Sequence, residues 1–272
     1  MTGREVRRAL RDGKPVFSTC LVSEAHLWPK VIPELGIDFV FLDSEHIPRD
    51  RVSLSWMCRT YDALGIPPVV RIPSPDPYEA CKVIDGGASG VISPYTETVE
   101  QAKDLVGATR YRPLKGDRLA EVLRDPQSME EPLREYLEEH NADIILILNI
   151  ESVPAIENLS DILKVPGIDA VQVGPHDLSC SLGIPEQYEH PRFKEAIMTI
   201  IHTAREHHVG AGVHYWLNVD QEIEWGKAGA NLIMHASDIH VVQEHMKREL
   251  DQLRRALGHE AIPLAASSKA TV

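Results

Sequence analysis

Two acidic residues, Glu151 and Asp177, stand just after short apolar segments that the sequence predicts to be buried strands. The first segment spans residues 144–150 and the second spans residues 171–173, and aliphatic, β-branched runs of this kind are typical of inner strands in a parallel sheet. Two carboxylates on neighbouring strand ends offer a hard divalent cation anionic oxygens on rigid supports, with water completing its coordination. Either acid alone could equally cap or begin a helix, but the pair favours a metal site.

The turn between the second segment and Asp177 contains Gly174, Pro175 and His176. Glycine lets the backbone approach a small ligand closely, and proline stiffens the turn that presents the acid. His176 could bind the cation, donate a hydrogen bond to a substrate or face solvent. We therefore expect this turn to border the binding site.

A second polar group follows the predicted strand 39–42 and comprises Asp43, Glu45 and His46. An imidazole has a pKa near neutrality, so His46, oriented by a neighbouring carboxylate, could act as a general base. Glu45 and His46 could instead simply begin a loop. Arg71 ends the next predicted strand, where its planar guanidinium suits a substrate carboxylate. It could also form a structural ion pair with Asp43 or Glu45.

Three further polar residues carry weaker signals. Asp85 precedes two glycines that are expected to end a helix, so it could accept a hydrogen bond from metal-bound water or be an ordinary helix terminus. His214 and His235 follow predicted strands, where a lone histidine is more often packed and hydrogen-bonded than catalytic. No lysine stands at the end of a predicted inner strand, which disfavours a Schiff-base mechanism.

These residues are expected to be positioned by one α/β fold, a (β/α)₈ TIM barrel. Predicted strands alternate with helices, no linker separates domains, and eight such units in this length favour a closed barrel over an open doubly wound sheet. No G-x-G-x-x-G or P-loop follows the first strand. We expect a barrel domain over residues 1–258 and a disordered tail over 259–272. The predicted strands are 17–22, 39–42, 68–72, 90–93, 144–150, 171–173, 212–215 and 231–235.

The composition excludes several classes of partner. A net charge of −13 disfavours binding to nucleic acid and to anionic membrane surfaces. The N-terminal residues 1–11 are polar and charged, unlike a signal peptide, and no apolar run approaches the length of a membrane span. The four cysteines are scattered without a C-x-x-C pair, which favours free thiols in a reducing cytoplasm. We expect a cytoplasmic protein that acts on small molecules.

Taken together, the chain resembles the HpcH/HpaI aldolase family, the metal-dependent (class II) pyruvate aldolases, from about Arg7 to Leu257. Members of this type act on 2,4-dihydroxyhept-2-ene-1,7-dioate or 2-keto-3-deoxy sugar acids. The resemblance is carried by residues 41–48 (FLDSEHIP), 69–71 (VVR) with 76–77 (DP), 87–91 (GASGV), 108–113 (ATRYRP), 150–152 (IES) and 174–179 (GPHDLS).

The resemblance implies a phosphoenolpyruvate/pyruvate-type barrel that cleaves and forms 4-hydroxy-2-oxo acids, giving pyruvate and an aldehyde through a metal-bound enolate. Glu151 and Asp177 match the metal ligands, and Arg71 matches the arginine beside the pyruvate carboxylate and carbonyl. A two-carboxylate site with water tolerates Mg²⁺, Mn²⁺ or Co²⁺. The family's hexamer, a trimer of dimers, exchanges the last helix between neighbours, which implies the same role for residues 241–257.

Further roles come with the resemblance. His46, with Asp43 behind it, matches the acid/base that acts through a metal-bound water. Asp85 matches an acid in the outer shell of that water. The backbone of Gly174 and Pro175 matches the segment that holds the keto-acid carboxylate.

The chain departs from the family's pattern at three places. Asn149 stands where the family has a glutamine, and His176 stands where members often have alanine. Residues 114–119 (LKGDRL) replace a glycine-rich stretch. These differences leave the aldehyde partner, and with it the natural substrate, unassigned, as are the stereochemistry, the preferred metal and the pathway.

Three other functions remain compatible with the sequence. A carbon–carbon lyase acting on CoA esters would need a basic patch, for which Arg110, Arg112, Lys115 and Arg118 are candidates. A metal-dependent 2-oxo acid decarboxylase, acting for example on oxaloacetate, would form the same enolate. A keto-acid-binding protein without turnover would keep the metal site alone.

Overall fold

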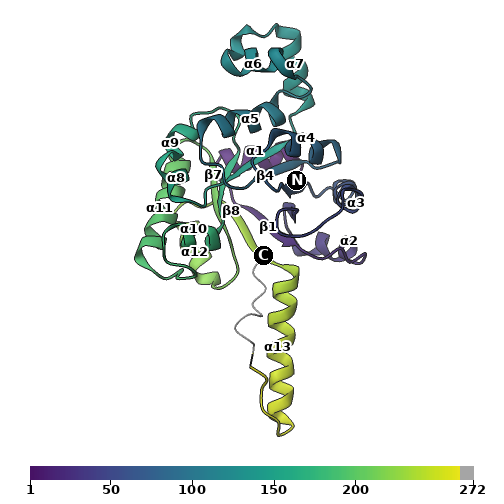
Figure 1. Ribbon diagram of the computed structural model, residues 1–272. Coiled ribbons are helices and arrows are strands. Elements are labelled where there is room, and N and C mark those ends of the chain that lie inside the picture. Colours follow the sequence, from purple (N-terminus) through teal and green to yellow (C-terminus); the bar gives the residue numbers. More distant parts are fainter. Residues whose placement is uncertain (264–272) are drawn as a thin grey trace.

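Eight parallel strands close into a barrel that is surrounded by helices (Figure 1). The structure, a computed structural model, describes residues 1–263, so the predicted tail of residues 259–272 lies mostly outside the described residues. Within residues 1–263 each strand pairs in parallel with the next along the chain, and the last pairs with the first. The predicted (β/α)₈ barrel is confirmed. The strands are β1 (Val16–Leu21), β2 (Phe39–Asp43), β3 (Pro68–Arg71), β4 (Gly90–Ser93), β5 (Ile145–Asn149), β6 (Ala170–Val173), β7 (Gly210–Tyr215) and β8 (Leu232–Ser237).

The inside of the barrel is a packed apolar core that is closed at one end. Alternate strand residues such as Phe41, Ile147 and Met234 are fully buried there in one cluster. Val6 and Leu10 of the first helix join this cluster, because that helix covers the end of the barrel where the strands begin. The outward-facing strand residues form a second cluster with the surrounding helices. The end where the strands finish is therefore the one available for a binding site.

Several helices begin where a side chain can accept a hydrogen bond from the first turn. Asp50, Asp76 and Thr98 cap three consecutive helices in this way. The α-helices are α1 (Gly3–Arg11), α2 (Trp28–Val31), α3 (Arg51–Ala63), α4 (Pro77–Asp85), α5 (Val99–Arg110), α6 (Gly116–Arg124), α7 (Glu131–His140), α8 (Val153–Glu157), α9 (Leu159–Ile162), α10 (Pro175–Ser181), α11 (Pro191–Glu206), α12 (Val219–Lys227) and α13 (Asp238–Ala256), and the short 3₁₀ segments are Ile32–Leu35 and Pro126–Ser128.

One segment agrees with the sequence prediction and one differs from it. The stretch 111–132, for which the charged sequence predicts a long loop with a short helix, contains the 9-residue helix α6, which forms with α7 a pair of helices that projects from the barrel (Figure 1). Pro175 begins α10 instead of only stiffening a turn, because proline at the first helical position loses no intrahelical hydrogen bond. Asp177 consequently lies in the first turn of a helix.

The last helix, α13, leaves the end of β8 and extends away from the barrel (Figure 1). Several of its large apolar side chains are exposed, among them Val242, Leu250 and Leu253. The outer face of β1 and β8 is also partly open: Phe17 is exposed and borders a cleft of about 560 Å³ together with Ile233. Within residues 1–263, no helix is long and apolar enough to cross a membrane.

Candidate active site

Glu151 and Asp177 meet at the end of the barrel where the strands finish. Glu151 follows β5 and is almost fully buried, while Asp177 projects from α10, directly after β6. Between them lies Gly174, where an ideal Cβ atom would stand 2.3 Å from Glu151 Oε2 and 3.6 Å from Asp177 Oδ2. A side chain at this position would collide with the glutamate, so only glycine leaves the space open. The structure thus brings the two predicted ligands to one small space.

The electrostatics of this space favour a cation. Burial raises the pKa of Glu151 to about 7, and the nearby charges of Asp177 and Glu45 add to this effect against a backbone hydrogen bond from Tyr95. Burial likewise raises the pKa of Glu45 to about 7, with Arg71 opposing it. A divalent cation would relieve this repulsion. Within residues 1–263 no group of three or more Asp, Glu, His or Cys forms a candidate metal cluster.

Tyr95, which the sequence analysis missed, contacts both carboxylates. Its backbone N–H donates to Glu151 Oε1 and its hydroxyl donates to Asp177 Oδ1, each at 2.8 Å. Its backbone has a φ of 44°, in the left-handed region that residues with a side chain seldom adopt. The available signal was its position two residues after β4, which matches that of Glu151 after β5.

Arg71 and Asp43 form a two-point ion pair inside the barrel mouth. Arg71 Nε donates to Asp43 Oδ1 at 2.8 Å and Nη2 donates to Asp43 Oδ2 at 2.7 Å. Burial alone would raise the pKa of Asp43, but the hydrogen bonds and the charge of Arg71 outweigh it and lower that pKa. Glu45 Oε2 lies 3.2 Å from the same Nε. The structural ion pair that the sequence left open is therefore present.

His46 lies at the edge of this group and is about half exposed. Its Nε2 atom is 3.6 Å from Glu45 Oε2. The resemblance placed Asp43 behind the imidazole, but Asp43 instead accepts hydrogen bonds from Arg71 and from the backbone N–H of Glu45. The carboxylate beside His46 is thus Glu45, which links the histidine to Arg71.

A pair of amide side chains lies beneath Glu151. Asn149 and Gln172 are register partners on β5 and β6, and both are fully buried. Asn149 Nδ2 donates to Glu151 Oε2 at 3.1 Å. Asn149 Oδ1 and both polar atoms of Gln172 have no hydrogen-bond partner among the described residues. Buried polar atoms seldom stay unpaired, so these three atoms are available to form hydrogen bonds with water or a ligand.

Asp85 and His176, which were predicted to lie at the site, contact other parts of the protein. Asp85 ends α4, which precedes the start of β4, and its exposed carboxylate pairs with Arg112. His176 lies on α10 with its ring 3.9 Å from Glu186 and 4.0 Å from the sulfur of Cys180. Within this single chain, neither joins Glu151 and Asp177 through a described contact.

The two histidines predicted to follow strands lie within the last residues of β7 and β8, and both are bonded within the protein. His214 Nε2 donates to the carbonyl of Ala236 at 3.0 Å, and burial lowers its pKa to about 4. His235 pairs with Glu222 at 2.8 Å. His214 agrees with the expectation that a lone histidine at a strand end is packed and hydrogen-bonded, whereas His235 is paired but about half exposed.

The basic residues considered for CoA binding are mostly engaged. Arg110 donates to Asp169 and to the backbone carbonyls of Ile144 and Gly167. Arg112 pairs with Asp85, as described above, and Arg118 pairs with Glu121 and Glu130. They therefore do not form a free basic patch.

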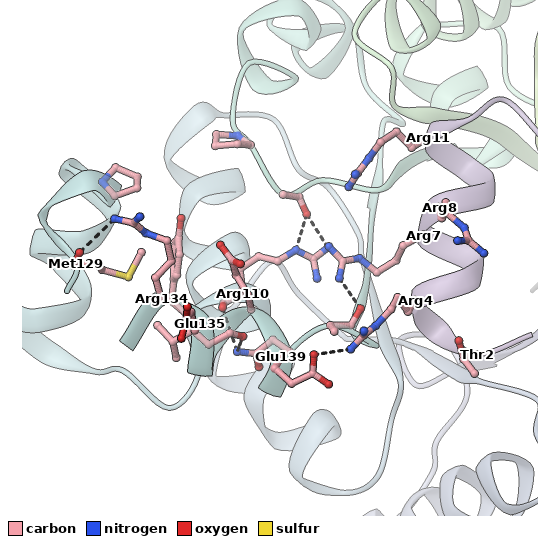
Figure 2. A pocket seen from close by; sticks show the side chains of 18 of the residues that line it. Thr2, Arg4, Arg7, Arg8, Arg11, Arg110, Met129, Arg134, Glu135 and Glu139 are labelled. Carbon is pink, nitrogen blue, oxygen red and sulfur yellow. Dashed lines mark hydrogen bonds and ion pairs between the residues drawn. The ribbon is translucent and has the colours of Figure 1, made fainter. Parts of the chain in front are cut away.

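An arginine-rich cleft of about 1460 Å³ lies at the other end of the barrel and is lined mainly by residues of α1 and α7 (Figure 2). Arg7 and Arg110 point toward each other there and share Asp169. Arg4 reaches across to Glu139 of α7. These pairs join α1 to the loops and helices around it, so the cleft's central arginines serve the fold.

Comparisons with known proteins agree with one another. The family model described as HpcH/HpaI aldolase/citrate lyase matches residues 21–244. A 2-keto-3-deoxy-L-rhamnonate aldolase of Salmonella gallinarum is 32% identical over 206 residues, 76% of this chain and 77% of that protein. A 5-keto-4-deoxy-D-glucarate aldolase of Klebsiella pneumoniae is 29% identical over 228 residues, 83% and 87% of the two chains. The crystal structure of an HpcH/HpaI aldolase from Desulfitobacterium hafniense is similar with a TM-score of 0.80 and 26% identity, over 94% of this chain and 98% of that one.

Proposed function

The chain belongs to the HpcH/HpaI aldolase/citrate lyase family, and we propose that it is a carbon–carbon lyase that cleaves and forms 4-hydroxy-2-oxo acids with the help of a divalent cation. The products of cleavage are pyruvate and an aldehyde. The relatives are named for keto-deoxy sugar acids, so hydroxylated sugar-derived 2-oxo acids are the first substrates to test.

One observation carries this proposal: Glu151 Oε2 and Asp177 Oδ2 face the same space, which the missing side chain of Gly174 leaves open. Two carboxylate oxygens in this half-buried, negatively charged space can coordinate Mg²⁺, Mn²⁺ or Co²⁺. When bound, such a cation supplies a Lewis acid for the negative charge that develops on the 2-oxo group. The residues around the space fit that requirement.

The remaining residues are assigned by what they can reach. Arg71 gives Nε and Nη2 to Asp43, which leaves Nη1 to bind the 2-oxo acid. The backbone of Gly174 and Pro175 holds the substrate carboxylate beside the two acids. His46 takes the proton of the 4-hydroxyl group as the carbon–carbon bond breaks, with Glu45 next to its imidazole.

We also propose that the protein works as a homo-oligomer, a hexamer built as a trimer of dimers. Helix α13 extends away from its own barrel with apolar side chains exposed, and the outer face of β1 and β8 is open beside Phe17. An exchange of α13 between two subunits would cover both surfaces. All four cysteines are free, which supports a location in the reducing cytoplasm.

The test is exchange of the pyruvate methyl protons in D₂O, followed by NMR, with Mn²⁺ or Mg²⁺ and then with EDTA. It requires no knowledge of the aldehyde, because formation of the enolate alone exchanges these protons. We expect metal-dependent exchange in the wild type and none in Glu151→Gln or Asp177→Asn, which keep the size of the side chain and remove its charge. Glu157→Gln, an exposed acid on α8, is the matched control. Absence of exchange in the wild type with any metal would refute the proposal.

A further inference from the structure

We propose that Tyr95 is a positioning residue of the cation site, which holds one oxygen of each carboxylate so that the other oxygen of each faces the space beside Gly174. This inference rests on the proposed function, because it takes Glu151 and Asp177 to be the cation ligands. It adds a residue from a third strand end, that of β4, to a site otherwise built on β5 and β6.

The division of oxygen atoms supports this role. Tyr95 binds Glu151 through Oε1 and Asp177 through Oδ1. The other two oxygens, Glu151 Oε2 and Asp177 Oδ2, are the ones that approach the Cβ position of Gly174. A carboxylate fixed by a hydrogen bond at one oxygen presents the other in a defined direction. One residue thus sets the direction of both.

The two acids depend on Tyr95 to different degrees. Glu151 also accepts a hydrogen bond from the amide of Asn149, so it has a second support. Asp177 lies half-buried in the first turn of α10, and within residues 1–263 the Tyr95 hydroxyl is its only hydrogen-bonding side chain. Removal of the hydroxyl therefore frees Asp177 while leaving Glu151 in place through the Tyr95 backbone N–H.

The backbone of Tyr95 is held in the conformation that this double contact requires. A φ of 44° costs energy for a residue with a bulky side chain and persists only where neighbouring structure fixes it. Pro94 precedes it, and Thr96 follows with its hydroxyl bonded to that of Ser93. The arrangement lets the backbone N–H reach one acid while the phenol reaches the other.

The experiment is a titration of the metal-free, full-length protein with Mn²⁺, monitored by calorimetry, for the wild type and Tyr95→Phe. Partners that orient metal ligands are typically worth 10- to 100-fold in metal affinity, so we expect the Kd for Mn²⁺ to rise by about that factor. The thermal midpoint of the metal-free variant should stay close to that of the wild type, since the hydroxyl contributes a single bond at the protein surface. Tyr136→Phe, a half-exposed tyrosine on α7, is the matched control and should leave the Kd unchanged.

A double-mutant cycle tests whether Tyr95 acts on the cation through Asp177. If Tyr95 acts through Asp177, then Tyr95→Phe should add little to the loss of affinity caused by Asp177→Asn. Equal Mn²⁺ affinity in the wild type and Tyr95→Phe would overturn the inference and leave the cation site standing, as would tighter binding, which would show that the hydroxyl competes with the cation. A wild type that binds no Mn²⁺ would instead refute the proposed function itself.

Discussion

Arg71 donates a hydrogen bond to each carboxylate oxygen of Asp43 at the end of the barrel where the strands finish, and the two residues are register partners on β3 and β2. The geometry fixes the plane of the guanidinium, and Glu45 approaches the same Nε from the side of His46. Arg71 is therefore held in one orientation before any substrate arrives. Such preorganisation reduces the entropy lost when a carboxylate binds.

The buried pair makes Asp43 important for stability. Asp43→Asn leaves a buried guanidinium with a neutral partner, which typically costs about 3–5 kcal/mol of the free energy of unfolding. Urea unfolding of the purified variant checks this value. Glu130→Gln, which removes an exposed partner of Arg118, should leave the unfolding midpoint unchanged. A wild-type midpoint in Asp43→Asn would show that Arg71 does not need the charge.

His46 should affect catalysis without affecting substrate affinity. His46→Ala is expected to slow carbon–carbon cleavage by about 10²- to 10⁴-fold, the usual contribution of a positioned acid/base, because the 4-hydroxyl proton has no acceptor. Pyruvate affinity, measured as inhibition of cleavage by pyruvate, should be nearly unchanged. His202→Ala, on the exposed face of α11, is the control. An unaltered cleavage rate would assign His46 a structural role.

His214 makes stability depend on pH. Burial lowers its pKa to about 4 from an ordinary value of 6.5, so between these values the unfolded chain binds a proton that the folded protein does not. The free energy of unfolding should therefore decrease as the pH falls from 6.5 towards 4, by about 2–3 kcal/mol from this residue. His214→Gln, whose amide can still donate to the Ala236 carbonyl, should show a smaller decrease in urea unfolding at pH 7 and pH 4.5. Parallel curves for the two proteins would contradict the assignment.

The exposed face of α13 should control assembly. Leu250→Arg places a charge among side chains that the exchanged helix would bury, so the protein should dissociate into smaller species on light scattering. Glu249→Arg, on the same helix, introduces the same side chain at a polar position and should leave the mass unchanged. A wild type that is already monomeric would refute the helix exchange.

The sequence predicted the barrel because each unit carried its own signal. Apolar runs of strand length alternated with helical periodicity, and polar residues such as Glu151 and Arg71 came at the strand ends. The register that brings Arg71 beside Asp43 follows from the parallel order of the strands. Parallel strands also explain why polar residues far apart in the chain meet at one end of the barrel.

The remaining features depend on conformation that spacing does not encode. Tyr95 reaches both acids only because its φ is positive, and nothing in the residues Pro94 to Thr96 requires that value. Asp85 is an exception, because the predicted alternation of strands and helices already places the end of its helix where the next strand begins, opposite to Glu151. The strongly charged stretch 111–132 predicted a short helix but not its bounds, because Val122 is the single buried side chain of α6 and the apolar pattern there is weak.

Because β1 pairs with β8, the barrel cannot close until the last strand has been synthesised. β1 lies within the first 21 residues, whereas its second hydrogen-bonding partner begins at Leu232. At translation rates of about 5–20 residues per second, roughly 10–40 s separate the two strands. During this interval β1 has an unpaired edge, and such edges are templates for association with other chains. A nascent chain shorter than about 230 residues is thus an open, aggregation-prone sheet, so the yield of this protein in a cell should depend on its chaperones.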